Sequence, residues 1–102
     1  MTVAQRTRAY LSATLPPLRD PRTVYFIGCR GLPYVKIGKA FSPGHRLKDL
    51  QVGCPVNLFI MATTTAFSEY RLHYIFKSLR VRGEWFKLDW ELQNFINQLH
   101  GS

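Results

Sequence analysis

The stretch from residue 24 to residue 39 constrains the fold of this chain more than any other part of the sequence. It reads Val-Tyr-Phe-Ile-Gly-Cys, then Arg-Gly-Leu-Pro, then Tyr-Val-Lys-Ile-Gly-Lys. Two short runs rich in β-branched and aromatic residues on either side of a Gly- and Pro-containing break are the pattern of a β-hairpin. The sequence therefore predicts two paired antiparallel strands near the start of the domain.

The register of this hairpin decides which side chains meet. The simplest register closes the loop between Gly28 and Pro33 and places Tyr25 opposite Lys36, with Tyr34 on the same face. The opposite face carries four apolar side chains that can enter a core: Val24, Phe26, Val35 and Ile37. A phenol beside an ammonium group, held on one strand face, is the first place where the sequence suggests chemistry.

Length and charge limit the kind of protein that this chain can form. At 102 residues it is long enough for one small domain with one core. Lys and Arg number 14 against 6 Asp and Glu, which gives a formal net charge of +8. Such an excess favours a polyanionic partner, most often nucleic acid and less often an acidic membrane surface.

Other sequence features indicate where the protein works. No apolar run reaches the roughly 18 residues of a membrane span, and the N-terminus lacks the apolar core of a signal peptide. Cys29 and Cys54 form no CxxC pair and no four-ligand metal set with the three histidines, so free thiols are favoured over a disulfide. We therefore expect an intracellular protein, cytoplasmic or nucleoid-associated, with no membrane partner, as a monomer or a homodimer.

The rest of the chain alternates helical and extended patterns. Ser42 and Pro43 are typical of a helix start, which predicts a helix over residues 43–51. Residues 56–65 read as a strand, and apolar spacing predicts a second helix from residues 67–68 to about 79. Residues 80–83 read as a basic turn and residues 84–86 as a short extended piece. Asp89 is the expected cap of a last helix to about residue 99.

These elements define the expected architecture. The fold class is α+β, a small three-stranded antiparallel sheet flanked by helices in the order β-β-α-β-α-α. Residues 1–22 form an N-terminal extension, either a short helix packed on the domain or a basic arm, and Pro16-Pro17 ends any helix there. Residues 23–100 form the domain itself. We assign three large aromatic residues to its core: Trp85, Phe86 and Trp90.

Five short segments of the sequence stand in a familiar order. They are Val24-Tyr25-Phe26-Ile27, Val35-Lys36-Ile37-Gly38, Arg46-Leu47, Glu69-Tyr70-Arg71-Leu72-His73 and Gly83-Glu84-Trp85-Phe86. Each segment alone is weak, but together they are a specific signal. In this order and spacing they resemble the GIY-YIG nuclease superfamily over residues 23–88. The resemblance is greatest to its compact, stand-alone branch, which has a Lys-Ile-Gly second motif and a Gly-Glu-Trp-Phe segment.

The resemblance implies a metal-dependent endonuclease that hydrolyses phosphodiester bonds in DNA with Mg²⁺ or Mn²⁺. It makes Tyr25 the first motif tyrosine, Lys36 the occupant of the second motif's tyrosine position, Arg46 the helix arginine and Glu69 the carboxylate that holds the metal. Secondary site residues would be Tyr34, His73 and Glu84. Two departures from the superfamily pattern stand out: Lys36 stands at the position of a tyrosine, and Glu84 stands where many members have an asparagine.

These residue types suit phosphodiester hydrolysis. An ammonium beside a phenol favours the phenolate, so Tyr25 can act as a general base on water, while a desolvated Lys36 is the competing base. The sequence leaves the choice between them open. Arg46 offers a planar fork of donors to phosphate oxygens, and Glu69 offers the oxygen ligand that a hard divalent cation prefers. His73, one helical turn after Glu69, would support that carboxylate.

Each of these residues also has an ordinary structural explanation. By itself Tyr25 is a half-buried strand tyrosine, Lys36 an exposed strand lysine, and Glu69 a first-turn acid that complements the helix dipole. The combination, rather than any one residue, favours the functional interpretation.

Further basic residues in loops and at helix ends are expected to contact phosphates without reading base sequence: Arg30, Lys39, His45, Lys48, Lys77, Arg80 and Arg82. Whether the DNA is single-stranded, duplex or branched stays open. So do two alternatives: a catalytically weak or inactive nucleic-acid-binding module of the same fold, and an RNA nuclease.

Overall fold

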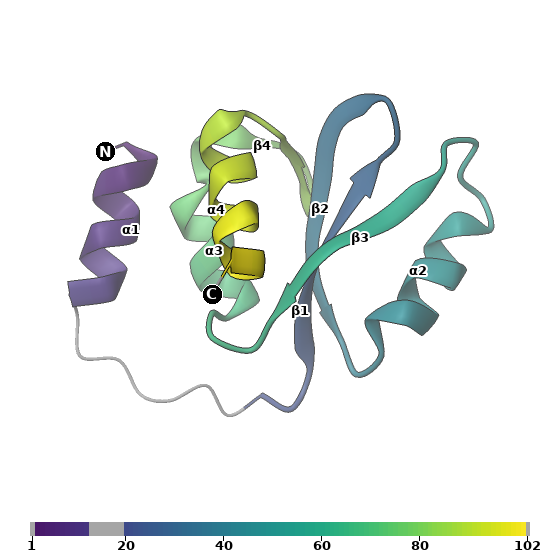
Figure 1. Cartoon of the computed structure of the whole chain (residues 1–102), viewed down its shortest axis with the longest axis horizontal. Helices are drawn as coiled ribbons and strands as arrows, with labels where there is room; N and C mark the ends of the chain where they lie inside the picture. The colour runs from purple at the N-terminus through teal and green to yellow at the C-terminus, as the bar shows by residue number, and fades with distance from the viewer. Residues whose placement is uncertain (1, 13–19, 102) are drawn as a thin grey trace.

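A five-stranded antiparallel sheet organises the computed structural model, which describes residues 2–12 and 20–101 (Figure 1). The strand order is β3-β1-β2-β5-β4. The strands are β1 (Thr23–Cys29), β2 (Leu32–Ala40), β3 (Leu58–Thr64), β4 (Arg80–Arg82) and β5 (Trp85–Lys87). The helices are α1 (Val3–Ser12), α2 (Pro43–Gln51), α3 (Glu69–Ile75), the 3-10 turn η1 (Lys77–Leu79) and α4 (Trp90–Gly101).

Helices cover both faces of the sheet. In Figure 1, α2 lies on one side of the strands, and α3 and α4 lie on the other with α1 outside them. The buried side chains separate in the same way. Val24, Phe26, Val35 and Ile37 join the larger core under α3 and α4, whereas Tyr25 and Ile27 join a smaller cluster with Leu47 and Leu50 of α2. The predicted division of the hairpin into two faces is therefore confirmed.

The predicted register of the hairpin is wrong. Tyr25 pairs with Gly38, and Lys36 pairs with Ile27. The strands are thus offset by two residues from the expected alignment, with an irregularity between Gly28 and Cys29. A shift of two residues keeps every side chain on its face of the sheet. The predicted faces are therefore correct, although the predicted cross-strand partners are wrong.

The sheet also has more strands than the three predicted, although the α+β class is confirmed. The segment expected to be a turn forms β4, and the short extended piece expected at residues 84–86 becomes β5, which pairs with β2 from Tyr34 to Lys36. Strands of three residues are too short to show an alternating pattern. Their pairing depends on contacts with distant parts of the chain, which local sequence does not encode.

Helix boundaries follow the capping residues closely. Ser42 accepts a hydrogen bond from the His45 amide at 3.3 Å and starts α2, whose bounds match the prediction. The second predicted helix ends early, since α3 stops at Ile75 and η1 follows. Asp89 accepts from the Leu92 amide at 3.0 Å and starts α4.

Trp90 is a further correction, because its side chain is 75% exposed rather than part of the core. It is the first residue of α4 and stands two positions before Leu92, the first buried residue of the helix stripe. Two residues correspond to about 200° around a helix, so Trp90 faces away from the core.

The N-terminal extension forms a helix that packs on the domain. Arg6 of α1 is buried, and its Nε donates a hydrogen bond to the Ile75 carbonyl at 2.8 Å while Nη2 bonds the Ser78 hydroxyl at 3.0 Å. Val3 joins the larger core. Arg6 thus satisfies carbonyl and hydroxyl groups at the end of α3, where a helix leaves acceptors unpaired. Residues 13–19, including Pro16-Pro17, lie outside the described residues.

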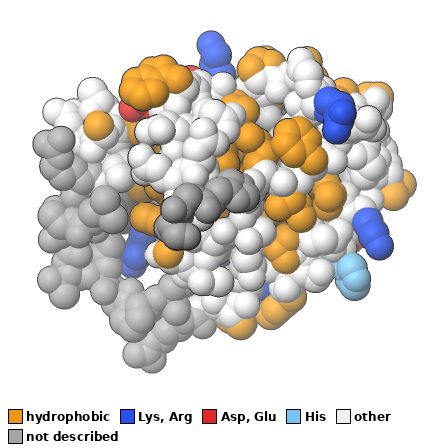
Figure 2. All heavy atoms as spheres, in the orientation of Figure 1, with side chains coloured by type: hydrophobic (Ala, Val, Ile, Leu, Met, Phe, Trp, Pro, Cys, Tyr) orange, Lys and Arg blue, Asp and Glu red, His pale blue; other side chains and the backbone are white. Residues whose placement is uncertain are grey.

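One face of the molecule is notably apolar. Figure 2 shows hydrophobic side chains gathered over the middle of the face that carries the edge strand β3, and Phe59 and Ile60 of that strand are exposed. Both cysteines are free and half-buried, and burial raises the pKa of the Cys29 thiol. In the described part of the chain, no helix is long and apolar enough to cross a membrane.

Gly38 is required by the Tyr25 ring that lies against it. A Cβ atom at position 38 would stand 2.6 Å from Cζ of Tyr25, and that ring is fully buried, so it has little room to move. Glycine inside a strand commonly marks such a close approach.

We predict that Gly38→Ala lowers the free energy of unfolding by about 1–3 kcal/mol, the usual cost of overpacking. Urea unfolding followed by circular dichroism measures this loss. Gly44→Ala is the matched control, because Gly44 lies in α2 with open space where its Cβ would be. The control is expected to be neutral or slightly stabilising. Equal midpoints for Gly38→Ala and the wild type would refute the packing constraint.

Candidate active site

A surface cavity of about 520 Å³ brings together most of the residues predicted to carry chemistry. Tyr25 of β1, Arg46 of α2, Glu69 of α3 and Glu84 beside β5 all line it. The remaining lining residues are Arg22, Lys39, Ala40 and Phe41. Four separate elements thus contribute polar groups to one depression, although they lie up to 59 positions apart in the chain.

Tyr25 is the most buried of these residues, with 1% of its surface exposed. Its ring packs on Gly38 and contributes to the smaller cluster, while the residue also forms part of the cavity wall. Packing on all sides fixes the ring in one orientation. The phenol is therefore a rigidly held group at the base of the cavity.

Two carboxylates share this site, and their pKa values move apart. Burial and a hydrogen bond with Glu84 raise the pKa of Glu69 to about 7. Burial alone would also raise the pKa of Glu84, but hydrogen bonds with Glu69 and Lys36 outweigh it and lower that pKa below its ordinary value. Two neighbouring carboxylates cannot both ionise freely, so one proton is retained between them, on Glu69.

Lys36 forms an ion pair with Glu84 rather than a cross-strand pair with Tyr25. Its Nζ lies 2.9 Å from Oε1 of Glu84 and 5.8 Å from the centre of the Trp85 ring. The lysine side chain is largely buried and does not line the cavity. The cross-strand pair of Tyr25 and Lys36 that the simplest register predicts is therefore absent, and the lysine instead neutralises a carboxylate of the site.

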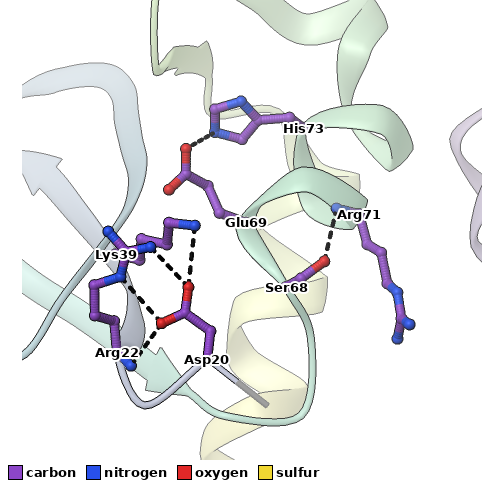
Figure 3. Close-up of polar contacts among 7 residues, drawn as sticks. All are labelled: Asp20, Arg22, Lys39, Ser68, Glu69, Arg71 and His73. Atoms are coloured by element: carbon purple, nitrogen blue, oxygen red, sulfur yellow. Dashed lines mark hydrogen bonds and ion pairs between the residues drawn. The ribbon is translucent and has the colours of Figure 1, made fainter. Parts of the chain in front are cut away.

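His73 lies beside Glu69, one helical turn further along α3. Its Nε2 lies 2.8 Å from the Ile37 carbonyl. The same ring nitrogen lies 3.7 Å from Oε1 of Glu69, and Figure 3 shows this contact. A carbonyl only accepts hydrogen bonds, so Nε2 carries the proton and donates it to Ile37. The ring also packs edge-on against Phe86 at 4.9 Å, which fixes its orientation.

Glu69, His73 and Glu84 form a group that could hold a metal ion, since one ligand atom from each lies within 4.8 Å of the others. The donor chemistry fits a hard divalent cation, because both glutamates supply carboxylate oxygens. The Nε2 proton that His73 donates to Ile37 leaves the two carboxylates as the first ligands and the imidazole as their support.

A cluster missed by the sequence analysis lies beside Glu69. Figure 3 shows Asp20 between Arg22 and Lys39. Two nitrogens of Arg22 donate to the Asp20 carboxylate at 3.0 and 2.9 Å, and Nζ of Lys39 lies 3.1 Å from it. These hydrogen bonds, above all that of Arg22, hold the pKa of Asp20 well below its usual range, and that of Arg22 is raised in turn.

A sequence signal for this cluster did exist. An Asp-Pro step favours a turn whose Asp side chain caps the backbone, and here the Arg22 amide donates to Asp20 at 3.0 Å. The turn directs Arg22 back toward Asp20, beside the strand that carries Tyr25. Lys39 was predicted only as a phosphate contact, and the structure adds its ion pair with Asp20.

The other predicted residues surround the site at varying distances. Arg46 is exposed on α2 and reaches the cavity, whereas Tyr34 is exposed on β2 and does not line it. The remaining predicted phosphate contacts are all exposed and none of them lines the cavity: Arg30, His45, Lys48, Lys77, Arg80 and Arg82. Arg80 donates to the Gly83 carbonyl at 2.7 Å, and Lys77 lies 5.0 Å from the centre of the Tyr74 ring.

Comparison with known proteins gives one result. Neither the curated proteins nor the solved structures contain a match to this sequence. A family model described as the T5orf172 domain matches residues 22–99, which include every element from β1 through most of α4. The matched region contains the whole cavity. The chain therefore belongs to the T5orf172 domain family.

Proposed function

We propose that this protein is a GIY-YIG-type endonuclease that hydrolyses phosphodiester bonds in DNA with the help of a divalent metal. The T5orf172 family is related to GIY-YIG-like nuclease domains. The observation that carries the proposal is the meeting of Tyr25, Arg46, Glu69 and Glu84 in one cavity of a chain with net charge +8. A base, a phosphate-binding cation and a pair of carboxylates are the parts that such hydrolysis needs.

Tyr25 is the better candidate for the general base. It lines the cavity, its ring is fixed by packing, and its phenol has no large rearrangement to make. Lys36 lies outside the cavity and is held by Glu84 at 2.9 Å. Deprotonating that lysine would leave Glu84 without its neutralising partner, which costs free energy in a half-buried site. Lys36 therefore sets the charge of Glu84, and Tyr25, after losing its own phenol proton to solvent, takes the proton of the attacking water as a phenolate.

Arg46 provides the cation for the phosphate. It is exposed on the first turn of α2 and lines the same cavity as both carboxylates. A guanidinium offers two parallel donors to phosphate oxygens, and these bonds strengthen as negative charge builds up in the transition state. Neither Glu69 nor Glu84 approaches it in an ion pair among the described residues, so it is available to the substrate.

Glu69 and Glu84 would hold the metal, with His73 fixing Glu69 through its bond to Ile37. We propose Mg²⁺ or Mn²⁺, since two carboxylates and water are the ligands these ions prefer. When bound, such an ion stabilises negative charge on phosphate and leaving-group oxygens.

We predict that Glu69→Gln lowers DNA cleavage by at least about 100-fold, because an amide cannot replace a charged metal ligand. Single-stranded, duplex and branched DNA, and structured and unstructured RNA, are incubated with Mg²⁺ or Mn²⁺, and products are separated on a denaturing gel. Glu91→Gln in the first turn of α4 is the matched control and should retain full activity. If the wild type cleaves no substrate, the proposed nuclease activity is wrong and a nucleic-acid-binding module remains. If it cleaves RNA alone, RNA replaces DNA as the proposed substrate.

A second prediction separates the two candidate bases. Tyr25→Phe should reduce cleavage by about 100-fold or more, the usual contribution of a general base, while Tyr34→Phe should have no effect. Lys36→Arg keeps a cation beside Glu84 but supplies a group that stays protonated, so it should retain most of the activity. Cleavage rates under single-turnover conditions measure both effects. An inactive Lys36→Arg enzyme with an active Tyr25→Phe enzyme would assign the base to lysine.

The raised pKa of Glu69 predicts how metal affinity depends on pH. Below about pH 7 this carboxyl is protonated, and a cation must displace the proton before it binds. Affinity should therefore fall about tenfold for each pH unit below 7 and level off above it. Mn²⁺ binding followed by electron paramagnetic resonance between pH 5.5 and 8.5 tests this expectation. An affinity that is constant across this range would contradict the shared proton.

A further inference from the structure

A second depression adjoins the cavity. This smaller space, about 60 Å³, is lined by Asp20, Arg22, Val24, Lys39, Ser68, Glu69 and Tyr70. Arg22, Lys39 and Glu69 line both depressions. The two depressions therefore adjoin each other, and together they are called here the active-site groove; Tyr25 and Arg46 line only the larger one and Tyr70 only the smaller one.

Each depression of the active-site groove is lined by one highly exposed aromatic side chain. Phe41 lines the larger depression and is 78% exposed, and Tyr70 lines the smaller one and is 77% exposed. Scattered single apolar residues on a surface need no explanation. Two exposed aromatic rings that border the same charged groove do need an explanation. Neither ring gains the stabilisation that the buried aromatic residues gain by packing in the core.

Cations line the same two depressions as these rings. Arg22 and Lys39 are shared by both depressions, and Arg46 lines the larger one with Phe41. The Asp20 carboxylate, held by Arg22 and Lys39 at 2.9 to 3.1 Å, shows that these two side chains can bind one anionic group together. Asp20 takes only part of their donors, since a guanidinium has five N–H groups and an ammonium three, so a phosphate oxygen can bind beside the carboxylate.

Cations that follow a backbone, interleaved with exposed aromatic faces, are the pattern by which proteins bind unpaired strands. In a duplex the two faces of each base are covered by its neighbours, so an aromatic side chain has no free face to stack on. We propose that the active-site groove binds single-stranded DNA, with bases stacked on Phe41 and Tyr70 and phosphates held by Arg22, Lys39 and Arg46. This proposal rests on the proposed function in taking the groove as the substrate site.

Binding without cleavage tests the proposal. Fluorescence anisotropy measures the affinity of the metal-free protein, in EDTA, for a labelled 12-nucleotide strand that cannot pair with itself and for the same sequence as a duplex. The variants are Phe41→Leu and Tyr70→Leu, which keep an apolar side chain but lose the flat ring. Trp90→Leu is the matched control, because Trp90 is 75% exposed and lines neither depression. Phe41→Tyr keeps the ring.

The wild type should bind the single strand more tightly than the duplex. Each leucine variant should bind the single strand about tenfold more weakly and the duplex unchanged, while Trp90→Leu and Phe41→Tyr match the wild type. The proposal is overturned if the duplex binds as tightly as the single strand, or if the leucine variants lose nothing. Because these affinities are measured without metal, they stand apart from the cleavage assay. A protein that does not cleave DNA can still prefer the single strand, and a nuclease that cleaves DNA can still lack that preference.

Discussion

The close approach of Glu69 and Glu84 is the interaction on which the candidate site depends. Two carboxylates in a half-buried position repel each other and are poorly solvated, so the fold must offset their charge. The charge of Glu84 is offset more strongly than the charge of Glu69. Glu84 receives an ammonium at 2.9 Å from Lys36, whereas Glu69 has an imidazole at 3.7 Å, and its charge is favoured by Lys39 and Arg22 only from a distance. The proton on Glu69 completes the balance, and it occupies the place where a divalent cation would add charge of the same sign.

This arrangement links the site to the register of the hairpin. Because Tyr25 pairs with Gly38, its ring can lie flat against a residue without a side chain. Lys36, two positions away along β2, pairs with Ile27 of β1 on one side and with Trp85 of β5 on the other, and its Nζ reaches Glu84. The pairing of β1 with β2 thus separates Lys36 from Tyr25, and the pairing of β2 with β5 places it beside Glu84. Tyr25 lines the cavity, and Lys36 neutralises Glu84.

Sequence reasoning reached the parts of this structure that local pattern encodes. The two faces of the hairpin and the limits of α2 follow from alternation and from Ser42 and Pro43, which act within a few residues. The register, the strands β4 and β5, and the pairing of Asp20 with Lys39 depend on contacts between distant segments. Short-range signals do not determine such contacts.

The site residues show the same division. Tyr25, Arg46 and Glu69 came from the motif order, and the cavity brings them together. Trp90 was assigned to the core from its residue type, although its angular position on α4 already placed it off the apolar stripe. Arg22 was missed because it belongs to none of the five motifs, yet it lies nearer to the centre of the groove than most of the basic residues that were named.

The two departures from the GIY-YIG pattern explain each other. Lysine at position 36 instead of tyrosine would introduce an unpaired charge into a nearly buried position, and Glu84 instead of asparagine would add a second carboxylate beside Glu69. Each substitution alone is unfavourable, since a buried charge without a partner costs several kcal/mol. Together they form an ion pair of 2.9 Å. The net charge of the site is thereby kept, and two residues instead of one supply its carboxylate oxygens. The Lys36–Glu84 pair thus lets this chain bring two carboxylates to one site, while Tyr25 lines the cavity without Lys36 beside it.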